Sequence, residues 1–177
     1  SEGEKPILNK YTYQPVIAGK EIQIPNTELS VSTYSLSHVN PYESSAFLVR
    51  NASDYLLYLG DTGADTVEKT NKLAELWTAV APLVKAAHLK AIFIEVSFDN
   101  SMPDKALFGH LTPKLLMQEL NKLNALSEGK LKNTTIYITH IKPCASCEET
   151  IKQQIKEGNQ LGLQIAYPVQ GQAISIR

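Results

Sequence analysis

Near its middle the chain reads Ala91-Ile92-Phe93-Ile94-Glu95-Val96-Ser97-Phe98, an almost continuous apolar run that contains a single acid. A run of this length and composition is typical of a strand that is covered on both faces, as strands of parallel sheets are. An acid in such a strand needs a partner inside the protein, so Glu95 is a candidate functional residue.

After this run, helix-like and strand-like segments alternate. Thr112-Pro113 is typical of a helix start, and Ser146 with Glu149 forms a capping-box pattern at the start of another helix. The predicted elements are a helix with Leu116, Leu120 and Leu123 on one face before Gly129, a strand at Thr135–Ile138, a helix from Ser146 to about Gly158, and closing strands at Leu163–Ala166 and Ala173–Ile176. The second half is therefore predicted to be βαβαβ-like.

Before this run, short extended segments dominate. The predicted strands are Lys10–Tyr13, Glu21–Ile24, Leu29–Tyr34 and an antiparallel pair, Ser45–Arg50 and Tyr55–Leu59, joined by a turn at Asn51–Asp54. A long amphipathic helix is predicted from Asp65, with Glu68 in its first turn, Pro82 as a kink, and Leu73, Leu76, Trp77, Val80 and Val84 at helical spacing. The fold class is therefore predicted to be α/β, with one mixed sheet and helices on its outer face.

The composition predicts one domain over residues 1–177, since 43% of the chain is hydrophobic and 20% is charged. A net charge of -1 argues against long nucleic acids or an anionic membrane as partners and favours a small substrate. No segment approaches the roughly 20 apolar residues that a membrane-spanning helix needs. The two cysteines, Cys144 and Cys147, are too few for a disulfide framework and leave a local disulfide or two thiols open.

Four polar residues lie next to predicted strands or in turn-rich loops: His38, Asp61, His110 and His140. Strand ends of this kind hold ligands in α/β proteins, so these four residues are expected to converge at one edge of the sheet, with Glu95 behind His110. Simpler interpretations stay open, because Asp61 also suits a plain turn, His110 a structural turn, and Glu95 a backbone or lysine contact. The fourth histidine, His88, lies at the end of the predicted long helix, two residues before Lys90. A cation at this end complements the helix dipole, which suits a structural role.

Two of these residues lie in sequence motifs that resemble those of the metallo-β-lactamase superfamily. Leu59-Gly60-Asp61-Thr62 resembles its fourth metal-ligand motif. Ser35-Leu36-Ser37-His38, followed by the strand at Ser45–Val49, resembles the third motif, although Val39 stands where a glycine is expected. The order of the motifs along the chain matches that of the superfamily.

The other two residues, His140 and His110, lie in sequence motifs that resemble one branch of this superfamily. Ile138-Thr139-His140-Ile141-Lys142-Pro143 resembles the fifth motif in the form typical of class II cyclic-nucleotide phosphodiesterases. Phe108-Gly109-His110-Leu111-Thr112-Pro113, together with Glu95, resembles the paired histidine and glutamate loops of the phosphodiesterase branch, which includes transfer-RNA 3′-processing nucleases. The resemblance runs from about Leu29 to the end.

The resemblance implies a fold, a reaction and a role for each residue. It implies the C-terminal half of an αββα sandwich that hydrolyses cyclic AMP or cyclic GMP to the 5′-nucleotide with two divalent metal ions, zinc being the first choice. His38 would bind one ion, His140 the other, and Asp61 both, which makes Asp61 part of the catalytic set. His110 would protonate the leaving oxygen, and Glu95 would orient it.

The chain departs from the family in one respect, because the H-x-H-x-D-H motif does not occur in it. That motif would supply four metal ligands, so the chain is expected to need an N-terminal half and to be inactive alone. The alternatives are a nuclease or other phosphodiesterase with the same site, and a non-catalytic binding module. The sequence leaves open a homodimer and the compartment, for which the periplasm and the cytoplasm are the alternatives.

Overall fold

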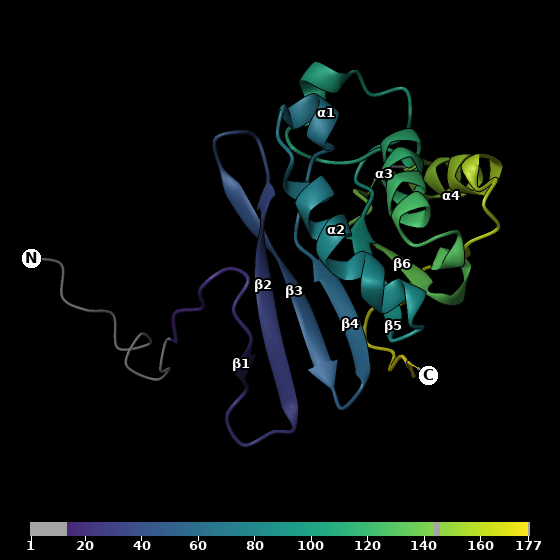
Figure 1. Cartoon of the computed structure of the whole chain (residues 1–177). Coiled ribbons are helices and arrows are strands. Elements are labelled where there is room, and N and C mark those ends of the chain that lie inside the picture. The colour runs from purple at the N-terminus through teal and green to yellow at the C-terminus, as the bar shows by residue number, and fades with distance from the viewer. Residues whose placement is uncertain (1–13, 144–145, 177) are drawn as a thin grey trace, which may run out of the picture.

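Seven strands form one mixed sheet in the computed structural model, which describes residues 14–143 and 146–176 (Figure 1). The strands follow one another across the sheet in chain order, from β1 to β7. Their bounds are β1 Ile22–Gln23, β2 Leu29–Ser37, β3 Glu43–Asn51, β4 Asp54–Leu59, β5 Leu89–Glu95, β6 Thr135–Thr139 and β7 Gln164–Ala166. The sheet confirms the predicted α/β class and the predicted antiparallel pair, β3 and β4.

The direction of the strands decides where the functional loops lie. The pairings from β1 to β4 are antiparallel, and those from β4 to β7 are parallel. Because β3 reverses the chain between them, β2 and β4 run the same way, and β5 and β6 share that direction. The carboxyl ends of β2, β4, β5 and β6 therefore meet at one edge of the sheet.

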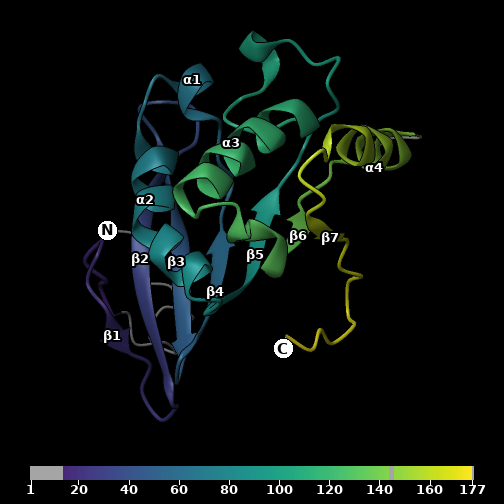
Figure 2. The same cartoon turned by 45° about the vertical axis from the view of Figure 1, so that its right-hand side comes forward.

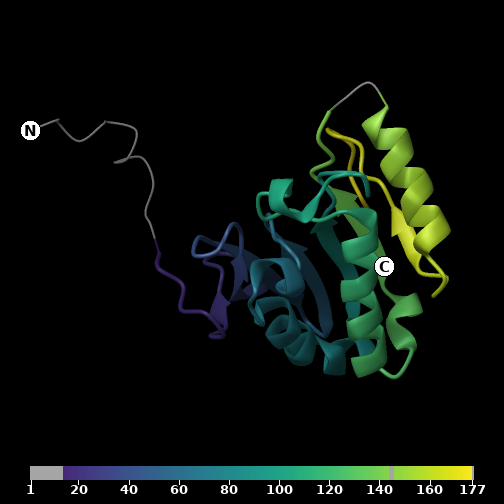
Figure 3. The ribbon, with the colours of Figure 1, turned by 90° about the horizontal axis from the view of Figure 1, so that it is seen from above.

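The helices cover one face of this sheet (Figures 2 and 3). Their bounds are α1 Asp65–Glu68, α2 Lys72–Lys85, α3 Pro113–Leu126 and α4 Cys147–Gly158, with short 3-10 turns η2 at Asp104–Ala106 and η3 at Lys130–Asn133. The apolar residues of α2 and α3 that the spacing predicted are buried. They pack on alternate residues of the central strands, such as Leu57, Ile92 and Ile136, which share one row of the sheet. None of the helices in the described part of the chain is long and apolar enough to cross a membrane.

The predicted long helix from Asp65 is wrong, because two helices take its place. α1 ends after one turn at Lys69, whose φ of 56° is left-handed, and α2 begins three residues later. The Asp65 carboxylate accepts hydrogen bonds from the backbone N–H groups of Leu73 (3.1 Å) and Ala74 (2.8 Å). A short acidic side chain that bonds nearby backbone competes with helix continuation, so Asp65 caps α2 from outside it.

Two smaller predictions also need correction. α4 begins where predicted, but the Ser146 side chain makes no capping hydrogen bond, so the capping box does not form. Ala173–Ile176 is not a strand. Its alternating isoleucines suit a strand face, but a strand also needs a partner, and the segment pairs with no strand in the described residues. The predictions for Lys10–Tyr13 and for Cys144 lie outside the described residues.

The opposite face of the sheet carries a row of aromatic residues. Phe47, Tyr58, Phe93 and Tyr137 are register partners across β3, β4, β5 and β6. The rings of Phe93 and Tyr137 stack with centroids 4.5 Å apart, and Phe47 and Tyr58 are 40% and 45% exposed. We call these four residues the aromatic row. In the described residues, no helix lies against it.

Candidate metal and catalytic site

The predicted site residues gather at the edge where the carboxyl ends of the parallel strands meet. His38 directly follows β2, Asp61 lies two residues after β4, Glu95 is the last residue of β5, and His140 directly follows β6. His110 comes from the loop before α3 and lies among them, with ring centroids 4.9 Å from His38 and 5.2 Å from His140. The convergence that the sequence predicted is thus confirmed.

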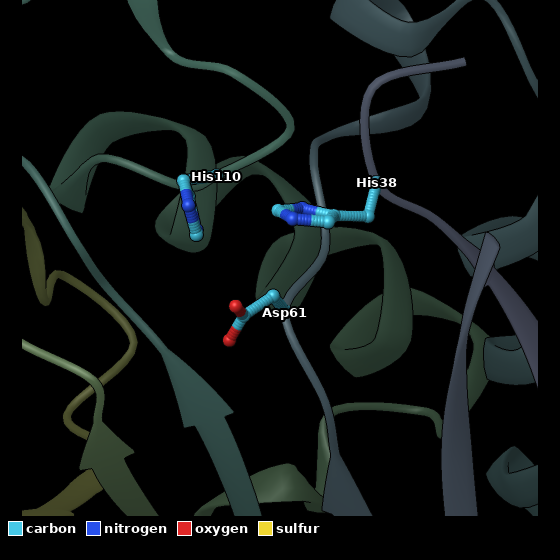
Figure 4. A group of neighbouring side chains, drawn as sticks. All are labelled: His38, Asp61 and His110. Carbon is cyan, nitrogen blue, oxygen red and sulfur yellow. The ribbon is translucent and has the colours of Figure 1, made fainter. Parts of the chain in front are cut away.

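One group in this cluster consists of His38, Asp61 and His110 (Figure 4). One ligand atom from each lies within 4.8 Å of the others. His110 is buried, whereas His38 and Asp61 are half-buried at the margin of the group. Imidazole and carboxylate groups at this spacing are suited to metal binding and to acid–base chemistry.

His38 is oriented by a backbone carbonyl from a distant loop. Its Nδ1 lies 3.1 Å from the carbonyl oxygen of Gly109. A carbonyl only accepts hydrogen bonds, so Nδ1 carries the proton and the lone pair is on Nε2. The approach is close, because a Cβ on Gly109 would lie 2.3 Å from the backbone nitrogen of Val39. Gly109 therefore allows the His110 loop to reach His38.

Val39 itself adopts a conformation that favours glycine. Its φ is 58°, in the left-handed region, which is costly for a β-branched residue. The glycine that the family resemblance led us to expect at this position has a physical reason, namely this backbone conformation. His140 has a φ of 56° as well, so the loops after β2 and β6 both contain left-handed backbone.

Asp61 is held by its backbone, and its carboxylate faces the site. The Asp61 carbonyl oxygen accepts a hydrogen bond from the Ser44 hydroxyl at 2.5 Å, and the next N–H, from Thr62, donates to Glu95 Oε1 at 3.1 Å. Asp61 Oδ1 lies 3.6 Å from Nδ1 of His140, and 36% of the Asp61 side chain is exposed. The carboxylate is therefore placed between the loops that carry the histidines and is accessible from outside.

Glu95 and His110 form a buried pair. Glu95 Oε1 lies 2.7 Å from His110 Nδ1, and the side chains are 1% and 6% exposed. Glu95 Oε2 accepts a hydrogen bond from the hydroxyl of Ser97 at 2.8 Å. Because Nδ1–H of His110 donates to Glu95, Nε2 of His110 is the atom that faces away from the pair and can meet a substrate. Glu95 stands behind His110, as the sequence predicted.

Two further residues hold the site together, and neither of them was assigned to the site from the sequence. The Glu68 carboxylate is buried and accepts hydrogen bonds from the Ser37 hydroxyl (2.9 Å) and the Asn40 backbone N–H (2.8 Å), which fixes the loop after β2. Ser97 is 1% exposed and contacts both Glu95 and His140. Ser97 lay inside the predicted strand run without a role of its own, and Glu68 was taken only as a helix-start residue.

Comparison with known proteins points to one family. The family described as class-II cAMP phosphodiesterases matches residues 6–171. A 3′,5′-cyclic-nucleotide phosphodiesterase of Aliivibrio fischeri is 40% identical over 98% of this chain and 54% of its own length. A probable 3′,5′-cyclic-nucleotide phosphodiesterase of Yersinia pestis is 35% identical over 93% of this chain and 49% of its own length. The chain spans about half the length of the curated relatives it matches.

Solved structures agree with the observed fold. The crystal structure of unliganded yeast PDE1 superimposes with a TM-score of 0.78 at 25% identity, over 88% of this chain and 48% of that one. The metallo-β-lactamase fold protein YhfI from Bacillus subtilis superimposes with a TM-score of 0.59 at 11% identity, over 92% of this chain and 57% of that one. At that identity the second match supports the fold alone. The mixed sheet and its helices are therefore about half of a metallo-β-lactamase fold.

Proposed function

This chain belongs to the class-II cAMP phosphodiesterase family, and from that premise we propose that it forms the C-terminal half of an enzyme that hydrolyses 3′,5′-cyclic nucleotides to 5′-nucleotides. Relatives named 3′,5′-cyclic-nucleotide phosphodiesterases are about twice as long as the part that matches. The proposal therefore concerns this chain together with an N-terminal half, and the chain alone is expected to be inactive.

The observation that carries the proposal is the arrangement of His38, Asp61 and His110 around one space, with Glu95 bonded to His110. Hydrolysis of a cyclic phosphodiester needs a positive charge beside the phosphate, a water nucleophile and a proton donor for the leaving oxygen. A metal site next to a buried acid–histidine pair can meet these needs together.

The donor set suits two divalent metal ions, with zinc as the first choice because its ligands are imidazoles and a carboxylate. In this proposal His38 is a ligand of one ion, His140 of the other, and Asp61 of both. Such ions, when bound, supply an acidified water molecule and polarise the phosphate oxygens. One histidine per ion and a shared carboxylate are too few ligands for tight binding, so the remaining ligands are assigned to the N-terminal half.

His110 donates the proton that the leaving 3′ oxygen requires. In its charged form the imidazole carries a proton on each ring nitrogen: Nδ1–H donates to Glu95 at 2.7 Å, and the Nε2 proton is the one that faces the leaving oxygen. The Glu95 carboxylate keeps the ring oriented and stabilises the positively charged imidazole, which are the requirements for a general acid. Because the pair is buried at 1% and 6% exposure, the interaction is little screened by solvent.

The aromatic row supports the assignment of an N-terminal half. A sheet face buries its apolar side chains against another layer in stable domains, and among the described residues the helices cover the other face of this sheet (Figures 2 and 3). Phe47 and Tyr58 are the most exposed members of the row. A second sheet lying over the row would complete a sandwich and bring further ligands to the adjoining edge.

The test uses the complete protein, with this chain preceded by the N-terminal sequence that its gene encodes. We expect cyclic AMP to be converted to 5′-AMP, which chromatography detects. Replacing Asp61 by Asn is expected to lower both zinc content and turnover. Replacing His110 by Asn is expected to lower turnover by about 100-fold, the usual scale for a general acid, with zinc content unchanged.

His88→Asn is the matched control, because His88 lies just before β5, at the opposite edge of the sheet. It should leave turnover and zinc content unchanged. Loss of zinc in the His110→Asn variant would make His110 a metal ligand and overturn its assignment as the proton donor. Cleavage of RNA without hydrolysis of either cyclic AMP or cyclic GMP would overturn the proposed substrate.

A further inference from the structure

Ser97 lies at the point where three of the site's loops meet. It is the second residue after β5 and is 1% exposed. Its backbone N–H donates to the carbonyl of Leu111 at 3.1 Å, and its carbonyl accepts from the N–H of Lys142 at 3.3 Å. The backbone of Ser97 is therefore attached to the loop that carries His110 and to the loop that follows His140.

The Ser97 hydroxyl has more neighbours than it has protons. Its Oγ lies 2.8 Å from Glu95 Oε2, 2.8 Å from His140 Nδ1, 3.1 Å from His110 Nδ1 and 3.2 Å from the His140 carbonyl oxygen. A hydroxyl donates one hydrogen bond and accepts up to two. The hydroxyl can therefore donate a hydrogen bond to only one of these neighbours.

Glu95 is the stronger acceptor for that proton. Hydrogen bonds to a carboxylate are shorter and stronger than those to a neutral carbonyl, and 2.8 Å to Glu95 compares with 3.2 Å to the His140 carbonyl. His110 Nδ1 has a shorter contact with Glu95 Oε1, at 2.7 Å, and donates there. Ser97 Oγ is then left to accept a hydrogen bond from Nδ1–H of His140 at 2.8 Å.

With Nδ1–H donating to Ser97, the lone pair of neutral His140 is on Nε2. His38 has the same arrangement, since its Nδ1 bonds to the Gly109 carbonyl oxygen. Ligand atoms of Glu95, His110 and His140 also lie within 4.8 Å of one another, but the Ser97 hydroxyl contacts all three residues. That second group is therefore a hydrogen-bonded cluster centred on Ser97.

We infer that Ser97 is a positioning residue, which fixes the Nδ1–H tautomer of His140 and connects His140 to the Glu95–His110 pair. Partners of this kind orient ligand histidines, and their loss commonly weakens metal binding about 10- to 100-fold. The inference rests on the proposed function where it takes His140 for a metal ligand. The tautomer itself is a property of this chain's own residues and is measured without metal.

Two-bond proton–nitrogen NMR of the chain with 15N-labelled histidine tests the inference. Spectra recorded without metal, at mildly alkaline pH where ordinary imidazoles are neutral, distinguish the two tautomers. We expect His140 to give the Nδ1–H pattern in the wild type. Ser97→Ala should change it to a mixed or Nε2–H pattern, and Ser97→Thr, which keeps a hydroxyl, should restore the wild-type pattern.

Ser127→Ala is the matched control, because Ser127 is also fully buried but donates to a helix carbonyl at the far end of α3. It should leave the His140 pattern unchanged. If Ser97→Ala does not fold, Ser97→Cys, which has a similar volume and a weaker donor and acceptor, takes its place. An Nε2–H pattern in the wild type, or an unchanged pattern after the loss of the hydroxyl, overturns the inference.

Zinc titration and cyclic AMP turnover of the complete protein separate this inference from the proposed function. Weaker zinc binding in Ser97→Ala by about 10- to 100-fold, with rescue by Ser97→Thr, supports the positioning role. A tautomer change in a protein that hydrolyses no cyclic nucleotide refutes the proposed function and leaves the Ser97 inference standing. Turnover with an unchanged tautomer refutes the inference alone.

Discussion

Gly109→Ala is the substitution that tests most directly how the loops are fitted together. At Gly109, φ is 75°, and a new Cβ would lie 2.3 Å from the nitrogen of Val39 and 2.8 Å from the carbonyl carbon of His38. Gly129 offers the matched control, since its φ is 78° and a Cβ there would meet nothing within 4 Å. The two variants share the conformational cost and differ in the steric one.

The magnitudes follow from these two terms. Left-handed backbone costs an alanine about 1–2 kcal/mol, partly offset by the lower entropy of its unfolded chain, so Gly129→Ala should lower the free energy of unfolding by about 1 kcal/mol. Gly109→Ala must also move backbone apart, which adds a strain of about 1–3 kcal/mol. Its total should be about 2–4 kcal/mol, and His38 should lose its orienting carbonyl.

Urea unfolding of both variants gives the two free energies, and zinc titration of the complete protein reports on His38. We expect Gly109→Ala to weaken zinc binding about 10-fold or more, as the loss of an orienting partner does, while Gly129→Ala binds normally. Equal destabilisation of the two variants, with normal zinc binding in both, would show that the close approach of the two loops does not position His38.

Three further substitutions probe separate features of the fold. Asp65→Ala should lower the free energy of unfolding by about 1–2 kcal/mol in urea, since its carboxylate caps α2. Val39→Gly should raise it by about 0.5–1 kcal/mol by relieving the φ of 58°, and thermal unfolding measures this gain. The pKa of Glu21 lies below its ordinary value because Arg50 hydrogen-bonds to it, so Arg50→Gln should raise that pKa in an NMR titration. A carboxyl group with a lowered pKa stabilises the fold at pH values above its ordinary pKa. The difference in unfolding free energy between wild type and Arg50→Gln should therefore shrink as the pH falls through the pKa of Glu21.

The positions of the site residues could be predicted because they depend on strand direction. Apolar runs identify the strands, and a polar residue just after such a run lies at the carboxyl end of its strand. His38, Asp61 and His140 all obey this rule. Their convergence needed only the inference that β2, β4 and β6 run the same way.

The break between α1 and α2 could not be predicted in the same way. Asp65 and Glu68 match a helix start, and the apolar spacing continues through α2, so the pattern favours one helix. The carboxylate of Asp65 bonds to backbone in α2, and Glu68 bonds to the loop after β2. These are tertiary contacts, and they override a local pattern that residue spacing alone describes.

Ser97 shows a different limit of the sequence. A single serine after a strand has no periodicity and belongs to no motif, so nothing in the sequence separates it from an ordinary turn residue. Its importance comes from the meeting of Glu95, His110 and His140, which lie far apart along the chain. Only the folded arrangement brings these partners to one hydroxyl.

The shared direction of β2 and β4 also leaves the other edge of the sheet without site residues. The turn between β3 and β4, residues 51–54, lies at that edge and is exposed throughout. Exposed turns of this kind accept insertions with little cost. A fluorescent reporter placed between Ala52 and Ser53 would therefore sit a full strand length from the candidate site, where it could report binding of the proposed N-terminal half without obstructing that site.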